Sequence, residues 1–363
     1  MRENKNLFLM REKKVRILFR HFVVVALVCN VLSAQNLPKI SGLMYSDYFY
    51  NIDNVAIAKK DLSGFQFRRI YFTTDFAVAD NFDSRFRLES DQSTSSNTNG
   101  GKLGVMVKDA YLKWKGIFSG SDLVFGISPT PAFDVSEAAW GYRSLEKTIL
   151  DLDGIVPSRD LGVDLKGKLT GNGLVNYWVK FANNSGNAPE TDKYKRYSTL
   201  LQFKLSENIQ ATVHADYAAK ANKMDSFDKQ AKSNNQFVGS IFLGYKQKED
   251  YSFGVEAFTR TIQNNFAKSA TQALQNQSSI GFSLWGWGTL SETLKLVGRF
   301  DNFDPNTDNV SDGTSFFMAG LDYKAAKNVS IIPNVQLFNY QAKDVQGKSV
   351  KDLTARVTFA YTF

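Results

Sequence analysis

The chain ends on the stretch LTARVTFAYTF, residues 353–363, in which every second residue is apolar and the last residue is Phe363. Side chains point alternately to the two faces of a β-strand, so this pattern predicts a strand with one apolar and one polar face. Such a strand could form the edge of a soluble sheet. It could also close a β-barrel in an outer membrane. The rest of the chain decides between these interpretations.

Short segments with the same alternation follow one another from residue 40 onward. Each is near the ~10 residues that a tilted transmembrane strand requires. Their number is sixteen, and an even number is typical of bacterial barrels made from one chain. The predicted strands cover residues 40–52, 64–79, 82–91, 103–117, 121–129, 159–170, 173–183, 194–206, 208–220, 235–248, 250–263, 277–290, 293–303, 314–325, 328–341 and 351–363.

The connections between these strands alternate between short and long. Short ones such as ADN (79–81) and KED (248–250) alternate with long polar ones such as NNSGNAPETDKYK (183–195) and DPNTDNVSDGT (304–314). A soluble sandwich has no reason to keep its long loops at one end, whereas a barrel with short periplasmic turns and long external loops does. We therefore predict an all-β fold, a transmembrane antiparallel β-barrel of about 16 strands formed by residues 35–363.

The alternation also assigns the two faces of each strand. In DLGVDLKGKL (160–169), the apolar Leu161 and Val163 oppose the charged Asp160 and Asp164. A lysine or arginine in the middle of a bilayer costs about 2–4 kcal/mol, so the charged face should line a wet interior and the apolar face should meet outer-membrane lipid.

Aromatic residues near strand ends, among them Tyr48, Trp178 and Trp285, are expected to form interfacial girdles. The last strand should close the barrel. Its aromatic residues Tyr361 and Phe363 resemble the signal that the barrel-assembly machinery of outer membranes recognises.

Residues 1–34 have the pattern of a secretory signal peptide. The basic REKKVRILFR (11–20) precedes the apolar FVVVALVCNVLSA (22–34), which ends in small residues. We expect cleavage after Ala34. A lipoprotein attached through Cys29 is an alternative, although the preceding valine stands where a small residue is expected.

The composition after this segment excludes several classes of protein. Residues 1–34 hold seven Lys/Arg and two Glu, so the formal charge of +8 falls by five to +3, and no nucleic-acid partner is implied. Cys29 is the only cysteine, which excludes a disulfide framework in residues 35–363. His214 is the only histidine there, so a barrel lipid hydrolase would depend on it. We predict no enzyme activity, no metal site and no cofactor.

One connection is both long and apolar, namely PTPAFDVSEAAWGYRSLEKTILDLDGIVPS (129–158) between the fifth and sixth strands. It contains Phe133, Trp140, Leu145 and Ile149, and its centre has helical spacing. Folded into the barrel, it would bury these side chains against the wall and act as a constriction loop. An external lid or a trimer-contact loop is the alternative.

Several segments together resemble the phosphate-selective porin O and P family, over nearly the whole length of residues 35–363. The resemblance implies a sixteen-stranded trimeric porin with an anion-favouring pore. It therefore implies passive diffusion of small hydrophilic solutes or anions through a water-filled barrel. The segments are GFQFRRIYFTTDF (64–76), VKDAYLKW (107–114), WGYRSLEKTILDLDGIVPSRDLGVDLKGKL (140–169), YWVKFANNSG (177–186) and GRFDNFDPNTD (298–308).

A pore selects solutes by its width and its electric field. The predicted constriction residues are Arg143 and Lys147, with Glu146 beside them. Adjacent residues in a strand face opposite ways, so of Arg68 and Arg69 we place only Arg68 in the lumen. Each wall cation could instead be a solvated charge paired with a carboxylate. The predicted pore-lining basic residues are Arg68, Arg85, Arg87, Lys113, Arg159, Arg299 and Arg356.

The remaining expectations concern partners and the competing function. A porin of this kind should form a homotrimer in the bacterial outer membrane. A non-conducting barrel that acts in adhesion through its loops is the alternative, and it predicts a plugged lumen.

Overall fold

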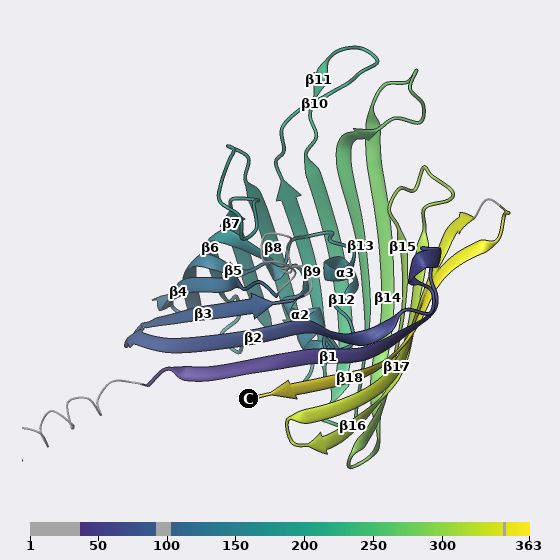
Figure 1. The fold of residues 1–363 in the computed structure, drawn as a ribbon. Helices are drawn as coiled ribbons and strands as arrows, with labels where there is room; N and C mark the ends of the chain where they lie inside the picture. Colours follow the sequence, from purple (N-terminus) through teal and green to yellow (C-terminus); the bar gives the residue numbers. More distant parts are fainter. Residues whose placement is uncertain (1–36, 92–102, 344–345) are drawn as a thin grey trace, which may run out of the picture. The chain divides into compact units, whose positions relative to one another are not determined.

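The structure is a computed structural model that describes residues 37–91, 103–343 and 346–363. The predicted signal peptide lies outside the described residues. Residues 40–363 form one compact unit, in which sixteen antiparallel strands form a closed barrel (Figure 1). The predicted fold class is confirmed.

The sixteen barrel strands agree with the predicted ones to within three residues at each end. They are β1 (Lys39–Asp53), β2 (Ser63–Ala79), β3 (Phe82–Ser90), β4 (Met106–Phe118), β5 (Ser121–Pro129), β6 (Arg159–Lys168), β7 (Val175–Ala182), β8 (Arg196–Lys204), β9 (Ile209–Ala218), β12 (Gln236–Gln247), β13 (Tyr251–Phe266), β14 (Gln275–Ser291), β15 (Leu294–Asp304), β16 (Thr314–Ala326), β17 (Val329–Lys343) and β18 (Ser349–Thr362).

The other elements are short. The strands β10 (Lys223–Met224) and β11 (Ala231–Lys232) pair within the connection from β9 to β12, and the helices are η1 (Ile57–Lys59), η4 (Pro131–Phe133), α2 (Asp134–Trp140) and α3 (Ile149–Leu152). None of the helices in the described part of the chain is long and apolar enough to cross a membrane.

The last strand closes the barrel, as predicted, by pairing with the first. Tyr48 of β1 lies opposite Val357 of β18 in an antiparallel register. The N–H of Gly42 donates to the carbonyl oxygen of Phe363 at 3.0 Å, and the N–H of Phe363 donates back at 3.1 Å. A glycine fits at position 42, because a Cβ there would lie too close to the backbone carbonyl oxygen of Tyr71 and to the ring of Phe363.

Short and long connections leave the barrel at opposite ends. The turns at residues 80–81, 119–120 and 327–328 are short, whereas residues 183–195 and 219–235 form long connections. Figure 1 shows the loop that carries β10 and β11 at the end of the barrel away from the turn between β16 and β17. We call these two ends the long-loop end and the short-turn end.

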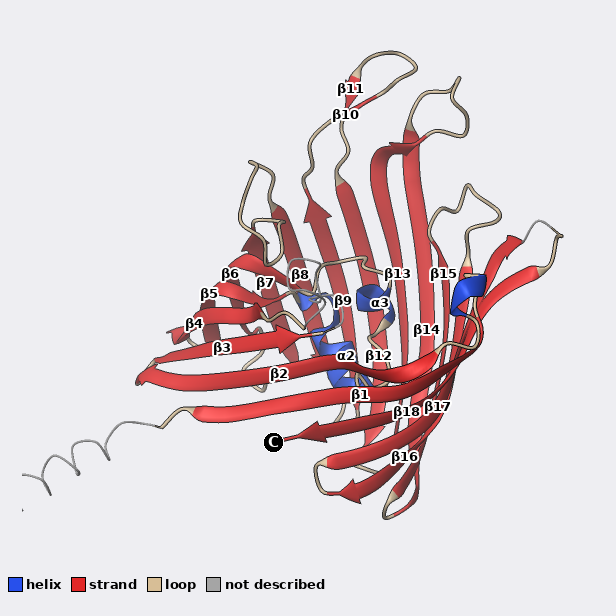
Figure 2. Ribbon diagram, in the orientation of Figure 1, coloured by secondary structure: helices blue, strands red, loops and turns tan. Residues whose placement is uncertain are grey.

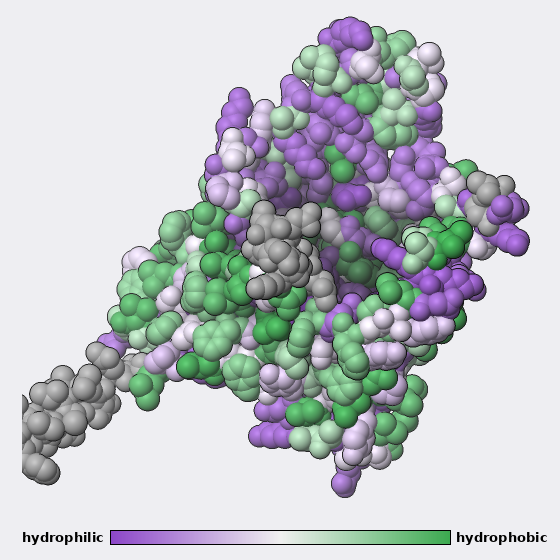
Figure 3. All heavy atoms as spheres, viewed as in Figure 1, coloured by the Kyte–Doolittle hydropathy of each residue, from purple (hydrophilic) through white to green (hydrophobic). Residues whose placement is uncertain are grey.

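The outer wall is apolar and the inner wall is largely polar. On β12, Ile241 and Leu243 point outward and are 59% and 52% exposed. Ser240, on the opposite face of the same strand, is buried. Figure 3 shows apolar residues over the wall of the barrel and hydrophilic residues over the long loops.

Aromatic side chains form a row on the outer wall near the long-loop end. Successive ring centroids in this row lie 5.0, 6.3 and 4.9 Å apart. Its members are Phe181, Tyr197, Tyr217 and Phe237. Tyr245 on β12 stacks against Tyr251 near the other end. Eight residues separate Phe237 from Tyr245, which gives a height of roughly 20 Å for a strand tilted by about 40°.

Two of the tryptophans expected in such girdles lie inside the barrel instead. Trp178 is 7% exposed and its Nε1 donates to Asp164 at 2.7 Å, and Trp285 is 2% exposed. The girdle prediction is wrong for both residues, because their positions along β7 and β14 share the face of the inward polar residues. Tyr48, by contrast, is exposed on the outside.

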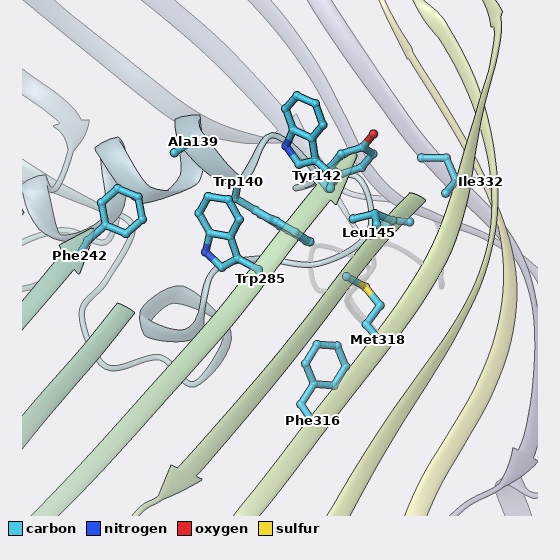
Figure 4. Packing of buried hydrophobic residues seen from close by; sticks show 11 residues of the cluster. Ala139, Trp140, Tyr142, Leu145, Phe242, Trp285, Phe316, Met318 and Ile332 are labelled. Carbon is cyan, nitrogen blue, oxygen red and sulfur yellow. The ribbon is translucent and has the colours of Figure 1, made fainter. Parts of the chain in front are cut away.

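The long connection between β5 and β6 lies inside the barrel, where Figure 2 shows α2 and α3. We call it the inward loop, residues 130–158. Trp140, Leu145, Ile149 and Leu150 are fully buried, and Figure 4 shows part of this packing. An external lid would leave these side chains in water. Ile149 and Leu150 pack with Val238 and Phe258 of the wall. The wall partners of Trp140 and Leu145 include Phe242, Trp285, Val297, Phe316, Met318 and Ile332, from β12 and β14 to β17.

The assignment of faces can be tested with two arginine substitutions. We expect Ile241→Arg, on the outer face midway between the two aromatic groups, to lower the free energy of unfolding in lipid vesicles by about 2–4 kcal/mol. Gln210→Arg, on the inner face, should change it by less than about 1 kcal/mol. Denaturant titration in vesicles measures both, and equal losses would contradict the assigned faces.

Candidate functional site

Arg299 on β15 fastens the inward loop to the wall. Its guanidinium pairs with Asp301 at 2.5 Å and donates to the carbonyl oxygen of Lys147 in the loop. It also lies over the ring of Trp140, 5.7 Å from the centroid. The side chain is completely buried. The prediction that Arg299 lines a pore is therefore wrong, because the loop covers this part of the wall.

Further polar contacts tie the loop to the strands β2, β13 and β16. The hydroxyl of Ser136 donates to Glu256 at 2.9 Å, and the hydroxyl of Tyr142 donates to Asp322 at 2.9 Å. Arg68 on β2 pairs with Asp47 and donates to the carbonyl oxygens of Ser144 and Leu145. Neither end of the loop segment 136–145 can therefore move without breaking a charge-assisted hydrogen bond.

A cavity of 360 Å³ lies between the loop and the strands β1, β2 and β18. We call it the arginine cavity. Five cations and two carboxylates line it, together with Tyr45 and Gln66. Five of the ten predicted pore residues meet here. The charged lining residues are Arg68, Arg69, Arg143, Lys147, Arg356, Asp91 and Glu146.

The five cations differ in how far their charge is compensated. Arg143 pairs with Glu137 and with Asp151, the latter at 2.8 Å. Arg69 pairs with Glu89 at 3.1 Å. Within the described residues, the side-chain cations of Lys147 and Arg356 form no ion pair within 4.0 Å. Positive charge therefore predominates in the cavity.

Both Arg68 and Arg69 reach the cavity, so the prediction that only one of them faces the lumen is wrong. Phe67 and Phe72 are both exposed on the outer wall, at 40% and 45%, although they are five positions apart and residues at an odd spacing in a regular strand face opposite ways. The strand thus shifts its phase by one residue at the two arginines, as a β-bulge does. The sequence FQFRRIYF carries this signal, because its apolar alternation changes phase at the Arg-Arg pair.

The other predicted wall cations form a separate group on β3, β4 and β6. Each is paired with a carboxylate, as the alternative interpretation expected. Their charges are therefore largely compensated, and the structure does not bring them into the arginine cavity. The pairs are Arg85–Asp75 at 2.7 Å, Arg87–Asp109 at 3.2 Å, Lys113–Asp83 at 3.2 Å and Arg159–Asp109.

The pKa values of two carboxyls in the inward loop are shifted in opposite directions. Burial raises the pKa of Asp153 to about 7, and the negative charge of Asp301 adds to the effect. Burial would also raise the pKa of Asp151, but the charges of Arg143 and Lys147 outweigh it and the pKa is lowered.

His214 has no role in a site on the outer wall. It is 2% exposed on the inner face of β9, and its two ring nitrogens contact the hydroxyls of Ser198 at 3.0 Å and Ser240 at 3.3 Å. A lipid hydrolase would need this base next to lipid. The position of His214 gives no support to that alternative.

Solved structures of outer-membrane proteins share the fold. An anion-selective porin from Comamonas acidovorans is 11% identical, with a TM-score of 0.63 over 90% of this chain and 99% of its own. The outer-membrane channel DcaP of Acinetobacter baumannii is 12% identical, with a TM-score of 0.63 over 90% and 97%. OmpT of Vibrio cholerae is 10% identical, with a TM-score of 0.60 over 90% and 97%. At these identities the likeness establishes the barrel fold.

The chain matches no protein-family model and no curated protein sequence. Membership in the phosphate-selective porin O and P family therefore stays a prediction.

The role of Arg299 in fastening the loop can be tested by substitution. We expect Arg299→Gln to lower the free energy of unfolding by about 3–5 kcal/mol, because it leaves Asp301 buried without its partner. The double variant Arg299→Gln, Asp301→Asn should recover part of this loss. Arg85→Gln, at a half-exposed pair, should cost less than about 1 kcal/mol. Denaturant titration compares the variants, and equal losses for Arg299 and Arg85 would exclude the fastening role.

The raised pKa of Asp153 predicts a pH dependence of stability. A carboxyl with a raised pKa holds its proton more tightly in the folded state than in the unfolded chain, where Asp titrates near about 4. Its contribution to stability is therefore full below about pH 4 and is lost as the pH rises to about 7. Asp153→Asn removes this dependence.

The measurement is the free energy of unfolding at several pH values. The wild type should lose more stability than Asp153→Asn between pH 4 and pH 7. Asp80→Asn, in the exposed turn after β2, is the control and should follow the wild type. Parallel curves for the wild type and Asp153→Asn would contradict the prediction.

Proposed function

We propose that the protein is a bacterial outer-membrane porin that allows passive diffusion of small hydrophilic solutes, with a preference for anions. The closed barrel with an apolar outside and a polar inside supports this proposal, since a β-sheet in lipid leaves no backbone group unpaired only when it is closed. The comparison structures support it too, because two of them are named as an anion-selective porin and an outer-membrane channel.

The position of the inward loop is the observation that most strongly supports the proposal. The loop packs on the wall from β12 to β17, and the arginine cavity stays open between the loop and the strands β1, β2 and β18. This loop is the proposed constriction. The contacts of Arg68 and Arg299 with its backbone hold it in place.

The charge of the arginine cavity supports anion preference. Among the described residues, the side chains of Lys147 and Arg356 add positive charge to the cavity without forming an ion pair within 4.0 Å. Guanidinium groups offer a planar fork that matches carboxylate and phosphate oxygens. Phosphate is thus one candidate solute.

The rest of the proposal concerns how the protein reaches the membrane. Residues 1–34 direct the chain across the inner membrane, and residues 35–363 insert as a homotrimer. Tyr361 and Phe363, 38% and 57% exposed on the outer face, are the proposed signal for the assembly machinery. No enzyme activity and no cofactor are proposed.

The reversal potential of purified protein in a planar bilayer under a KCl gradient tests the proposal. We expect chloride preference. The double variant Lys147→Gln, Arg356→Gln should lower the chloride-to-potassium permeability ratio by roughly two- to five-fold, because it removes the two uncompensated charges. Lys113→Gln, outside the arginine cavity, is the control and should leave the ratio unchanged. Asp83 keeps a cationic partner in this variant, because its contact with Lys115 at 2.9 Å remains.

Two other outcomes of this measurement would contradict the proposal. Channels that prefer potassium would refute the anion preference and leave a general porin. The absence of channels would favour the plugged barrel that acts in adhesion.

A further inference from the structure

A second cavity, of 270 Å³, lies at the short-turn end of the barrel, against residues 138–144 of the inward loop. Lys327, in the turn after β16, and Glu249, in the turn after β12, place it at this end. We call it the lysine cavity. Four lysines and two carboxylates line it, which leaves an excess of positive charge. The charged lining residues are Lys246, Lys295, Lys324, Lys327, Glu249 and Asp322.

The lysine cavity also has an aromatic wall, formed by Tyr45, Tyr142 and Trp287. The ring centroids of Tyr142 and Trp287 lie 6.4 Å apart in an edge-on arrangement. Ala139 and Ile332 extend this wall. The arginine cavity differs, because Tyr45 is the one aromatic residue among its lining residues. Tyr45 lines both cavities, so they lie next to each other at this ring.

Several donors of the lysine cavity have no anionic partner. Trp287 is 8% exposed, and its buried Nε1 has no hydrogen-bond partner in the described part of the protein. Over the same residues, Lys324 and Lys327 have no carboxylate within 4.0 Å. Lys295 is held over the indole of Trp287, 4.2 Å from the centroid, and pairs with Glu249 at 3.1 Å. A buried donor without a partner is costly unless a ligand or water satisfies it.

We infer that the lysine cavity is a binding station for small carboxylates whose body is an aromatic ring. Lys324, Lys327 and the Nε1–H of Trp287 receive the carboxylate, and the aromatic wall receives the ring. An inorganic anion would use the lysines but would gain nothing from the aromatic and aliphatic lining. This inference rests on the proposed function, since it specifies a class of solute for the same pore.

The test uses purified full-length protein in planar bilayers, with sodium benzoate or sodium acetate added to either side of the membrane. Both anions carry one carboxylate, and only benzoate has a ring. We expect benzoate to reduce the chloride current in a saturable way, with a half-blocking concentration about ten-fold lower than that of acetate, because the ring is buried in the cavity.

Three variants locate the effect. Lys324→Gln combined with Lys327→Gln should raise the half-blocking concentration of benzoate about five-fold. Trp287→Phe, which keeps a ring but removes the N–H, should raise it about two- to five-fold. Lys204→Gln is the control, because Lys204 lies at the same end of the barrel on β8 and outside the cavity. The KCl conductance of each variant shows that the barrel has assembled.

The outcomes separate this inference from the proposed function. Chloride-selective channels on which benzoate and acetate act equally, or whose benzoate block ignores the lysine pair, would overturn the binding station and leave the porin intact. The absence of channels, or potassium preference, would overturn the proposed anion porin itself.

Discussion

The pairing of β1 with β18 is the constraint on which the rest of the molecule depends. It leaves the sheet without an open edge, so the backbone groups of the wall are bonded within the sheet. The hydrogen bonds between Gly42 and Phe363 complete this seam at its last residue. A closed wall has a defined inside, and the alternation of side chains then separates an apolar outer face from a polar inner one.

The inward loop packs against one part of the inner wall. Its apolar side chains have one place to avoid water, the patch of aromatic and aliphatic residues around Trp285 and Phe316 on the inner wall. Burial there supplies the driving force, and the buried Arg299–Asp301 pair fixes the position of the loop. The arginine cavity stays open on the side of β1, β2 and β18, and there the cations of β2 and β18 meet those of the loop.

The two cavities flank the same stretch of loop and differ in chemistry. The arginine cavity combines guanidinium groups with one aromatic residue, Tyr45, whereas the lysine cavity adds an aromatic wall to its cations. A solute that passes both would be sorted first by charge and then by the shape and polarity of its body. Tyr45, which lines both cavities, stands where these two steps meet.

The sequence by itself determined the strands, most of their faces and the two classes of connection, because these follow from local periodicity and turn composition. It favoured an inward position for residues 130–158 but left an external loop open. It also predicted Arg68, Arg143, Lys147 and Arg356, which the structure brings together. The phase change at Arg69 was present in the sequence but was missed. The burial of Arg299 depended on which wall strands the loop covers. That packing joins residues more than a hundred positions apart, so only the tertiary structure decided it.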